Sequence, residues 1–312
     1  MNGIISLGEA LIDFIPLDPQ NINYQKSPGG APANVAVGVA KLGARSTFLG
    51  KVGHDVLGTF LIETLKGHGV NVEAMKQTNE SKTGLVFVTN DETGDRSFSF
   101  FIDKSADQYL NEDDIDELLF DENKILHFGS ISLISEPVRS ATKKAVKLAK
   151  EKGLICSYDP NLRLGLWENE EVARETIISM LEYADVIKIS EEELTFITGE
   201  EDIEAGLQKL DAYQIPLVFV TLGSEGSFAF VNKELKQIPA MKVNAVDTTG
   251  AGDAFVSGIL YQLNETDKNI KELTLSEVEK MVSFASVSGG LTASTKGAMT
   301  ALPTLEEVKK YL

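Results

Sequence analysis

The residues with the clearest chemical pattern lie between Asp247 and Leu260, where the chain reads DTTGAGDAFVSGIL. A Gly-Ala-Gly turn that opens a helix leaves backbone N–H groups unpaired, and such a terminus attracts anions, phosphate above all. A carboxylate there, Asp253, would repel phosphate, but it suits a base that takes the proton from an attacking hydroxyl. Together these features are what phosphoryl transfer to an alcohol requires. The alternative is that Asp253 only complements the helix dipole and the glycines only make a turn.

A second pattern lies near the N-terminus, where Gly29–Gly43 reads GGAPANVAVGVAKLG. Paired glycines before a helix let the backbone approach a ligand closely. Asn34 at the helix start either caps the helix or binds a hydroxyl group. Asp13, just after the first predicted strand, is by position a solvated loop acid that offers two acceptor oxygens.

Polar residues also follow several later strands. Asp159-Pro160-Asn161-Leu162-Arg163 comes after one strand end, where open α/β sheets place ligands and where an arginine suits phosphate. A simple turn is the alternative. Acidic residues 191–193 precede an apolar helix and would complement its dipole. The turn Thr221–Gly226 (TLGSEG) follows a strand, but by itself it is only weak evidence of a ligand site. The sequence has no Walker A string, which argues against a P-loop kinase, and no GxGxxG after the first strand, which argues against a dehydrogenase.

The elements that must position these residues alternate between apolar strands and helices. Strands are predicted at Gly3–Gly8, Ser46–Val52, Lys124–Phe128, Leu154–Tyr158, Val186–Ile189, Leu217–Leu222 and Ser227–Val231. Helices are predicted at Asn34–Leu42, Val56–Lys66, Glu136–Lys152, Glu171–Glu182, Ala254–Leu263 and Ser276–Ser294. Repeated βα units with non-alternating apolar strands predict a mostly parallel sheet covered on both faces.

One region breaks this rhythm. Thr83–Asn90 and Arg96–Ile102 flank the Gly-containing turn at 91–95 and read as a β-hairpin. Leu11–Leu17 and Asn23–Ser27 are also short and strand-like. These segments form either a small separate sheet or an edge extension of the main sheet.

Composition restricts the class of protein. The chain has 312 residues, 29 basic and 47 acidic, with a net charge of −18, which disfavours nucleic acid and anionic lipid as partners. A single cysteine, Cys156, excludes an internal disulfide, and His54, His68 and His127 lack metal-ligand spacing, so we interpret all four as structural. No basic leader and no 18-residue apolar span is present, so we expect a soluble, cytoplasmic protein.

The two glycine-rich segments, in this order, resemble the two signatures of the ribokinase-like sugar kinases, the PfkB carbohydrate kinase family. The resemblance extends to Gly297–Pro303 (GAMTALP). It implies an α/β fold, a ribokinase-like three-layer α/β/α domain over residues 1–312 with a mainly parallel central sheet. It also implies a small β-sheet lid from segments at about 11–27 and 83–103, and transfer of a phosphoryl group from ATP to a sugar hydroxyl.

The resemblance implies a role for each matching residue. The catalytic set is Asp253 as base, the amides of Gly250, Ala251 and Gly252 as anion hole, and Arg163 near the transferred phosphoryl group. The sugar would contact Asp13, Gly29, Gly30, Asn34, Asp159, Asn161 and Asp253. The nucleotide would contact Ser190, Thr221, Gly223, Ser224, Gly226, Gly250, Gly252 and Ser286.

The same resemblance implies two cation sites. Glu193 matches the Glu of an N-x-x-E motif tied to Mg²⁺ through water, while Ser190 stands where the family usually has Asn. A possible K⁺ site comprises Asp247, Thr249, Thr292, Thr295 and Gly297.

Shorter strings narrow the substrate by resemblance. LGEALIDFIP, DPNLR with the following LW, SEEEL and GAMTALP are similar to fructokinases, which implies fructose as acceptor and, by analogy, a homodimer. The alternatives are 2-keto-3-deoxygluconate, for which Lys104 would be an extra cation, and the sugars or nucleosides of other family branches. A non-catalytic sugar sensor is disfavoured because the base and the anion hole are both intact.

Overall fold

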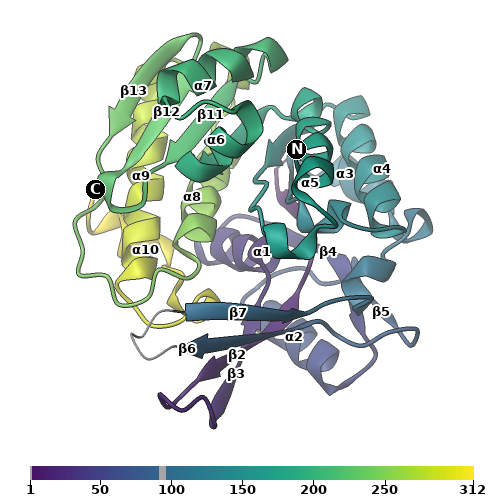
Figure 1. Cartoon of the computed structure of the whole chain (residues 1–312). Coiled ribbons are helices and arrows are strands. Elements are labelled where there is room, and N and C mark those ends of the chain that lie inside the picture. The colour runs from purple at the N-terminus through teal and green to yellow at the C-terminus, as the bar shows by residue number, and fades with distance from the viewer. Residues whose placement is uncertain (1, 91–95) are drawn as a thin grey trace.

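The computed structural model describes residues 2–90 and 96–312, so the predicted turn at 91–95 lies outside the described residues. Its main sheet has nine strands in the order β13-β12-β11-β10-β9-β8-β1-β4-β5 (Figure 1). The strands are β1 (Ile4–Leu7), β4 (Ser46–Gly53), β5 (Met75–Thr78), β8 (Ile125–Phe128), β9 (Ile155–Tyr158), β10 (Val186–Ser190), β11 (Leu217–Thr221), β12 (Ser227–Val231) and β13 (Glu234–Ile238). In this spatial order, all neighbours from β11 across to β5 pair in parallel, whereas β12 and β13 are antiparallel additions at one edge. The prediction of a mainly parallel sheet is confirmed.

Helices cover both faces of this sheet because successive strand residues point to opposite sides. Ile4 and Ile125 pack toward α1 (Ala31–Lys41), α8 (Ala251–Glu265) and α9 (Leu275–Ala293), with α2 (Val56–Gly67) and α10 (Leu305–Lys309) beside them. Ile5 and Leu126 pack toward α3 (Leu118–Glu122), α4 (Val138–Glu151), α5 (Glu170–Ile178), α6 (Glu191–Thr198) and α7 (Ile203–Leu210). Burial of these two apolar cores stabilises the three-layer arrangement.

Short 3₁₀ helices connect many of these elements. They are η1 (Ala106–Tyr109), η2 (Glu112–Asp114), η3 (Ile131–Leu133), η4 (Leu164–Leu166), η5 (Leu181–Tyr183), η6 (Asp211–Tyr213), η7 (Gly223–Glu225), η8 (Ile270–Glu272) and η9 (Met299–Ala301). In the described part of the chain, no helix is both long and apolar enough to span a bilayer.

The segments that break the βα rhythm form a second sheet, in the order β3-β2-β6-β7, that stands apart from the main one (Figure 1). Its strands are β2 (Leu11–Pro16), β3 (Tyr24–Gly29), β6 (Leu85–Asn90) and β7 (Arg96–Phe101). Stacking of Phe14 on Phe87, with ring centroids 4.8 Å apart, holds its strands together on one face. The interpretation as a separate small sheet is therefore confirmed over the edge-extension alternative.

Some boundaries differ from the sequence-based expectation. Helices α1 and α8 each begin three residues earlier than predicted, at Ala31 and Ala251. Each follows a glycine with positive φ, which redirects the chain into the helix. Strands β5 and β13 were not predicted, because MKQT and ELKQI are polar edge strands without an apolar run.

Candidate active site

The carboxyl ends of the central parallel strands meet the N-termini of α1 and α8 at a cavity of about 450 Å³ beneath the small sheet. This volume is within the range of roughly 300–1,000 Å³ typical of small-molecule sites. The cavity brings together nine predicted residues from distant parts of the chain: Asp13, Gly30, Asn34, Asn161, Arg163, Thr249, Gly250, Gly252 and Asp253. Phe98 and Phe100 of β7 line it from the small sheet. The sheet thus stands over the cavity as a lid would.

The N-terminus of α8 points its first amides at this cavity. Gly250 has a φ of 79° and serves as the N-cap, without a side chain to satisfy those amides. Ala251 N donates to the Thr248 carbonyl at 3.1 Å, so this one amide of the predicted anion hole is already engaged. Among described residues, the amides of Gly250, Gly252 and Asp253 meet no acceptor, as expected for the first turn of a helix. These three amides are available to an anion.

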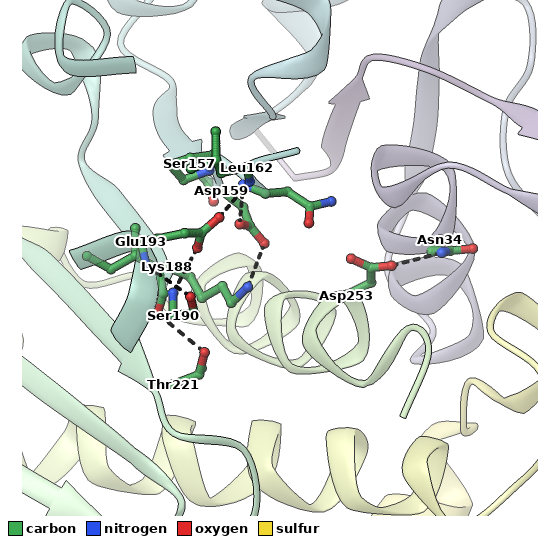
Figure 2. A network of polar contacts seen from close by, with 12 residues as sticks. Asn34, Ser157, Asp159, Leu162, Lys188, Ser190, Glu193, Thr221 and Asp253 are labelled. Atoms are coloured by element: carbon green, nitrogen blue, oxygen red, sulfur yellow. Dashed lines mark hydrogen bonds and ion pairs between the residues drawn. The ribbon is translucent and has the colours of Figure 1, made fainter. Parts of the chain in front are cut away.

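Asp253 lies in the same turn, against α1. Its Oδ2 accepts a hydrogen bond of 2.8 Å from Nδ2 of Asn34 (Figure 2). Burial raises the pKa of Asp253 to about 6, while the Asn34 bond and the charges of Lys188 and Arg163 oppose the rise. A carboxylate with a pKa near 6 is charged at neutral pH yet accepts a proton readily, which suits a general base. Oδ1 of Asn34 is buried without a partner among described residues.

A buried ion pair forms the opposite wall. Lys188, in β10, donates from Nζ to Oδ2 of Asp159 at 3.1 Å (Figure 2). Burial would lower the pKa of Lys188, but the charges of Asp159 and Glu193 raise it above its ordinary value, so the ammonium stays charged. A methyl group built on Gly252 would come 3.4 Å from this nitrogen. The Lys188 charge therefore lies beside the free amides of α8.

Glu193 ties two segments of this wall together. Its Oε1 accepts from Leu162 N at 2.7 Å, and its Oε2 accepts from Ser190 N at 2.8 Å. Ser190 is the N-cap of α6 and accepts from Glu193 N in return, which completes a capping box. Glu193 thus holds the 159–163 segment against the start of α6, and its predicted water-mediated magnesium contact stays a prediction.

The predicted nucleotide residues extend along the next strands. Thr221 donates to the Ile189 carbonyl at 3.3 Å, and a turn closed by Leu222 N to Gly226 O brings Gly223 and Ser224 to the surface. Gly226 has a φ of 104°, and an added Cβ would lie 2.1 Å from the Ile238 carbonyl oxygen, so only glycine fits. Ser286 accepts from Met241 N at 3.0 Å and fixes the loop after β13. Their contacts with a nucleotide remain predictions.

The predicted potassium residues gather behind the start of α8. Asp247 is buried, and its carboxylate accepts from Thr249 N and Gly297 N, both at 3.1 Å. Thr292 donates instead to the Ser288 carbonyl within α9, and Thr295 N donates to the Thr292 carbonyl. Within residues 2–90 and 96–312, no group of three or more His, Cys, Asp or Glu side chains could hold a metal ion. An Asp247 site would therefore rely on one carboxylate and neutral oxygens.

Further carboxyl groups lie near Asp13 and Asp253. Gly29 has no side chain, and a Cβ there would lie 2.1 Å from Oδ2 of Asp13. Burial raises the pKa of Asp13 to about 7, and the charge of Asp253 adds to the rise. Glu9 and Asp107 are also buried, and desolvation raises their pKa values to about 8 and about 6. At neutral pH some of these groups retain protons, which limits repulsion of an anionic ligand.

Comparison with known proteins agrees with this geometry. The model of the pfkB family carbohydrate kinases matches residues 1–305. This chain belongs to the pfkB family of carbohydrate kinases. It is 46% identical over 317 residues to Probable fructokinase-6, chloroplastic, of Arabidopsis thaliana, with 99% of this chain and 82% of the relative covered.

Two solved structures extend the similarity to the fold. One is a double-mutant fructokinase from Vibrio cholerae O395 bound to fructose, ADP and potassium ion. It is 40% identical, with a TM-score of 0.91, and the match covers 100% of this chain and 98% of the other. The second, fructokinase from Xylella fastidiosa with bound ATP, is 33% identical, with a TM-score of 0.93 and coverage of 99% and 97%. The predicted family and ribokinase-like fold are confirmed.

Three site residues of this pfkB kinase escaped sequence reasoning. Lys188 lies within the predicted strand Val186–Ile189 but received no role, because only the fold places it beside Gly252. Glu9 and His127 line a small inner cavity of about 10 Å³ that also touches Asp253. His127 was interpreted as structural, and its Nδ1 does pair with the Ser157 hydroxyl at 3.1 Å. The apolar strand around His127 carried no signal of a site.

Lys104, the cation suggested for a keto-acid substrate, is exposed, and among described residues it is not part of the cavity lining. The basic groups that do line the main cavity are Arg163 and Lys188. The position of Lys104 therefore gives no support to the keto-acid alternative.

Proposed function

We propose that this protein is a fructokinase that transfers the γ-phosphoryl group of ATP to D-fructose, giving fructose 6-phosphate. The observation that carries the proposal is the pairing of Asp253 with the free amides of Gly250 and Gly252 at one helix terminus. A base and an anion site within one turn suit an alcohol attacking a phosphoryl group. The relatives named fructokinase, at 33–46% identity, support fructose as the acceptor.

The chemical step follows from these positions. The sugar hydroxyl gives its proton to the Asp253 carboxylate, and its oxygen forms a bond to the γ-phosphorus. The bond between that phosphorus and the bridging oxygen breaks, and ADP leaves with the electron pair. The amides of α8, Lys188 and Arg163 balance the negative charge on the moving group, because positioning and charge stabilisation supply most of the catalysis in such reactions.

The sugar itself would lie between Asp13 and Asp253, under the small sheet. Carboxylate and amide oxygens of Asp13 and Asn34 accept hydrogen bonds from hydroxyl groups. Phe98 and Phe100 face the same cavity and would exclude water from it. Exclusion of water matters because water competes with the sugar as phosphoryl acceptor.

We assign the cations to two places. Magnesium would neutralise phosphate charge and, because both oxygens of Glu193 already accept amide hydrogen bonds, it would reach that residue only through water. Potassium would lie at Asp247, next to the loop that leads into α8. A buried carboxylate fits a cation that takes oxygen ligands.

We also propose that the protein is a homodimer through the outer face of the small sheet. Phe101 of that sheet is 61% exposed, and Leu17 and Ile22 beside its strands are 56% and 75% exposed. Exposed apolar side chains concentrated on one element indicate an interaction surface. Light scattering should give twice the monomer mass for wild type and the monomer mass for Phe101→Glu.

The test of the function is ADP release with Mg-ATP and K⁺ across fructose, 2-keto-3-deoxygluconate, ribose, aminoimidazole riboside and adenosine. We expect the highest kcat/KM with fructose, and in Asp253→Asn a loss of about 10²–10⁴-fold in kcat with the fold retained. A preference for another sugar would refute fructose but leave the kinase. Full activity of Asp253→Asn would refute the catalytic assignment.

A further inference from the structure

The start of α1 is held by a residue from a different element. Glu9 follows β1, and only 3% of it is exposed. Its Oε1 accepts from Ala31 N at 3.1 Å. The N-cap residue of α1, Gly30, has no side chain to satisfy this amide. Glu9 therefore supplies the cap from 22 residues earlier in the chain.

We infer that Glu9 is a positioning residue for Asp253, acting through α1 and the Asn34 amide. The inference rests on the proposed role of Asp253 as base. Asn34 lies in the first turn of α1, and its Nδ2 holds Oδ2 of Asp253 at 2.8 Å. A shift of the helix start would move this donor directly.

The backbone of Glu9 reinforces the effect of its side chain. Gly30 has a φ of 103°, and a Cβ at that position would lie 2.4 Å from the Glu9 carbonyl oxygen. The Glu9 carbonyl therefore lies close to Gly30, where a side chain would not fit, while the Glu9 carboxyl group accepts from the next residue, Ala31.

The groups around Glu9 decide its charge. Asp107 of η1 and Asp253 of α8 act on Glu9, and His127 of β8 and Asp159 after β9 line the same inner cavity. Burial raises the pKa of Glu9 to about 8, above that of Asp253, which is about 6. Between these values Glu9 carries a proton while Asp253 is charged. A neutral Glu9 caps the helix without repelling the base.

Three variants separate the cap from the charge. Glu9→Ala removes the acceptor, Glu9→Gln keeps a neutral acceptor, and Asp202→Ala removes an N-cap of α7, where Asp202 accepts from Ala205 N. We would measure kcat for fructose, thermal stability, and the titration of the Asp253 carboxyl by ¹³C NMR in ligand-free protein. The NMR signal is assigned from its loss in Asp253→Asn.

We expect Glu9→Ala to lower kcat by about 10–100-fold, the cost of a misplaced reacting group. It should also raise the pKa of Asp253, because a loosened Asn34 no longer stabilises the carboxylate. Glu9→Gln should keep kcat and the Asp253 titration near wild type up to pH 7. Asp202→Ala should lower stability alone.

Two results would overturn the inference: an unchanged Asp253 titration in Glu9→Ala, or an equal loss of kcat in Glu9→Gln and Glu9→Ala. The NMR titration needs no sugar, so it decides the role of Glu9 even if wild type fails to phosphorylate fructose. That failure would count against the proposed function, not against the effect of Glu9 on Asp253 through α1 and Asn34.

Discussion

Replacing Asn34 with alanine is expected to move the acid limb of the activity profile toward alkaline pH. Asp253 must be ionised to accept a proton, so the rate of wild type should rise with pH through the Asp253 pKa of about 6. The Asn34 bond of 2.8 Å favours the charged carboxylate and holds this pKa down. Loss of the bond therefore raises the pKa of Asp253.

The size of the shift follows from the hydrogen bond. A bond to a charged group contributes about 1.5–3 kcal/mol, and one pKa unit corresponds to about 1.4 kcal/mol. The midpoint should move from near pH 6 to between about pH 7 and pH 8. At pH 6 the variant would then have about a tenth or less of its own plateau rate, whereas wild type has about half.

The assay is ADP release at saturating ATP and limiting fructose from pH 5 to 9, with kcat/KM plotted against pH, because kcat/KM reports the pKa of the enzyme before it binds the sugar. Asn123→Ala is a matched control, because Asn123 is also buried, its Oδ1 meets no donor in the part of the chain that the structure describes, and its Nδ2 donates one hydrogen bond, to the Leu119 carbonyl. It should lose stability and keep the wild-type midpoint. A midpoint in Asn34→Ala at or below that of wild type would refute the reasoning, as would a wild-type rate that is flat from pH 5 to 7.

Three further predictions concern the glycines, the ion pair and stability. Gly250→Ala should lower the free energy of unfolding in urea by about 1–2 kcal/mol, because φ is 79° there. A Cβ on Gly252 would meet only Lys188, so Gly252→Ala should fold normally but bind ATP more weakly. Equal stability of the two variants would contradict this. Lys188→Met leaves the buried Asp159 carboxylate without its cation and should lower the free energy of unfolding by about 3–5 kcal/mol. Adding Asp159→Asn should recover part of that stability. No recovery would show that the two residues are not coupled. Burial raises the pKa of Glu9 and Asp13 to about 8 and about 7 from 4.5 and 3.8. The stability that these two protonated groups contribute is therefore full below the unfolded pKa values and is lost as pH rises, by about 2 kcal/mol between pH 6.5 and 8. A free energy of unfolding in urea that stays constant over that window would contradict these shifts.

The sequence alone determined the fold class and the chemical parts of the site. Apolar strands and amphipathic helices in alternation predict a parallel sheet, because a strand buried on both faces must be apolar throughout. The DTTGAGD segment predicts an anion site and its base, and GGAPAN predicts a close approach of the backbone to a ligand, because glycine turns and helix termini have local causes. These features depend on residues that are neighbours in the chain, which is why they can be predicted.

Tertiary structure alone decided which of these parts act on one another. The sequence suggested only a sugar contact or a helix cap for Asn34, and the fold shows that its Nδ2 holds Asp253, which is 219 residues away. Ala251 was expected in the anion hole, but its amide donates to the Thr248 carbonyl. Glu9 and Lys188 had no recognised role, since each acquires one through a partner on another element. A pKa, an ion pair or a remote cap depends on distance and burial, and both are set by how the strands order in the sheet and how the helices pack on it.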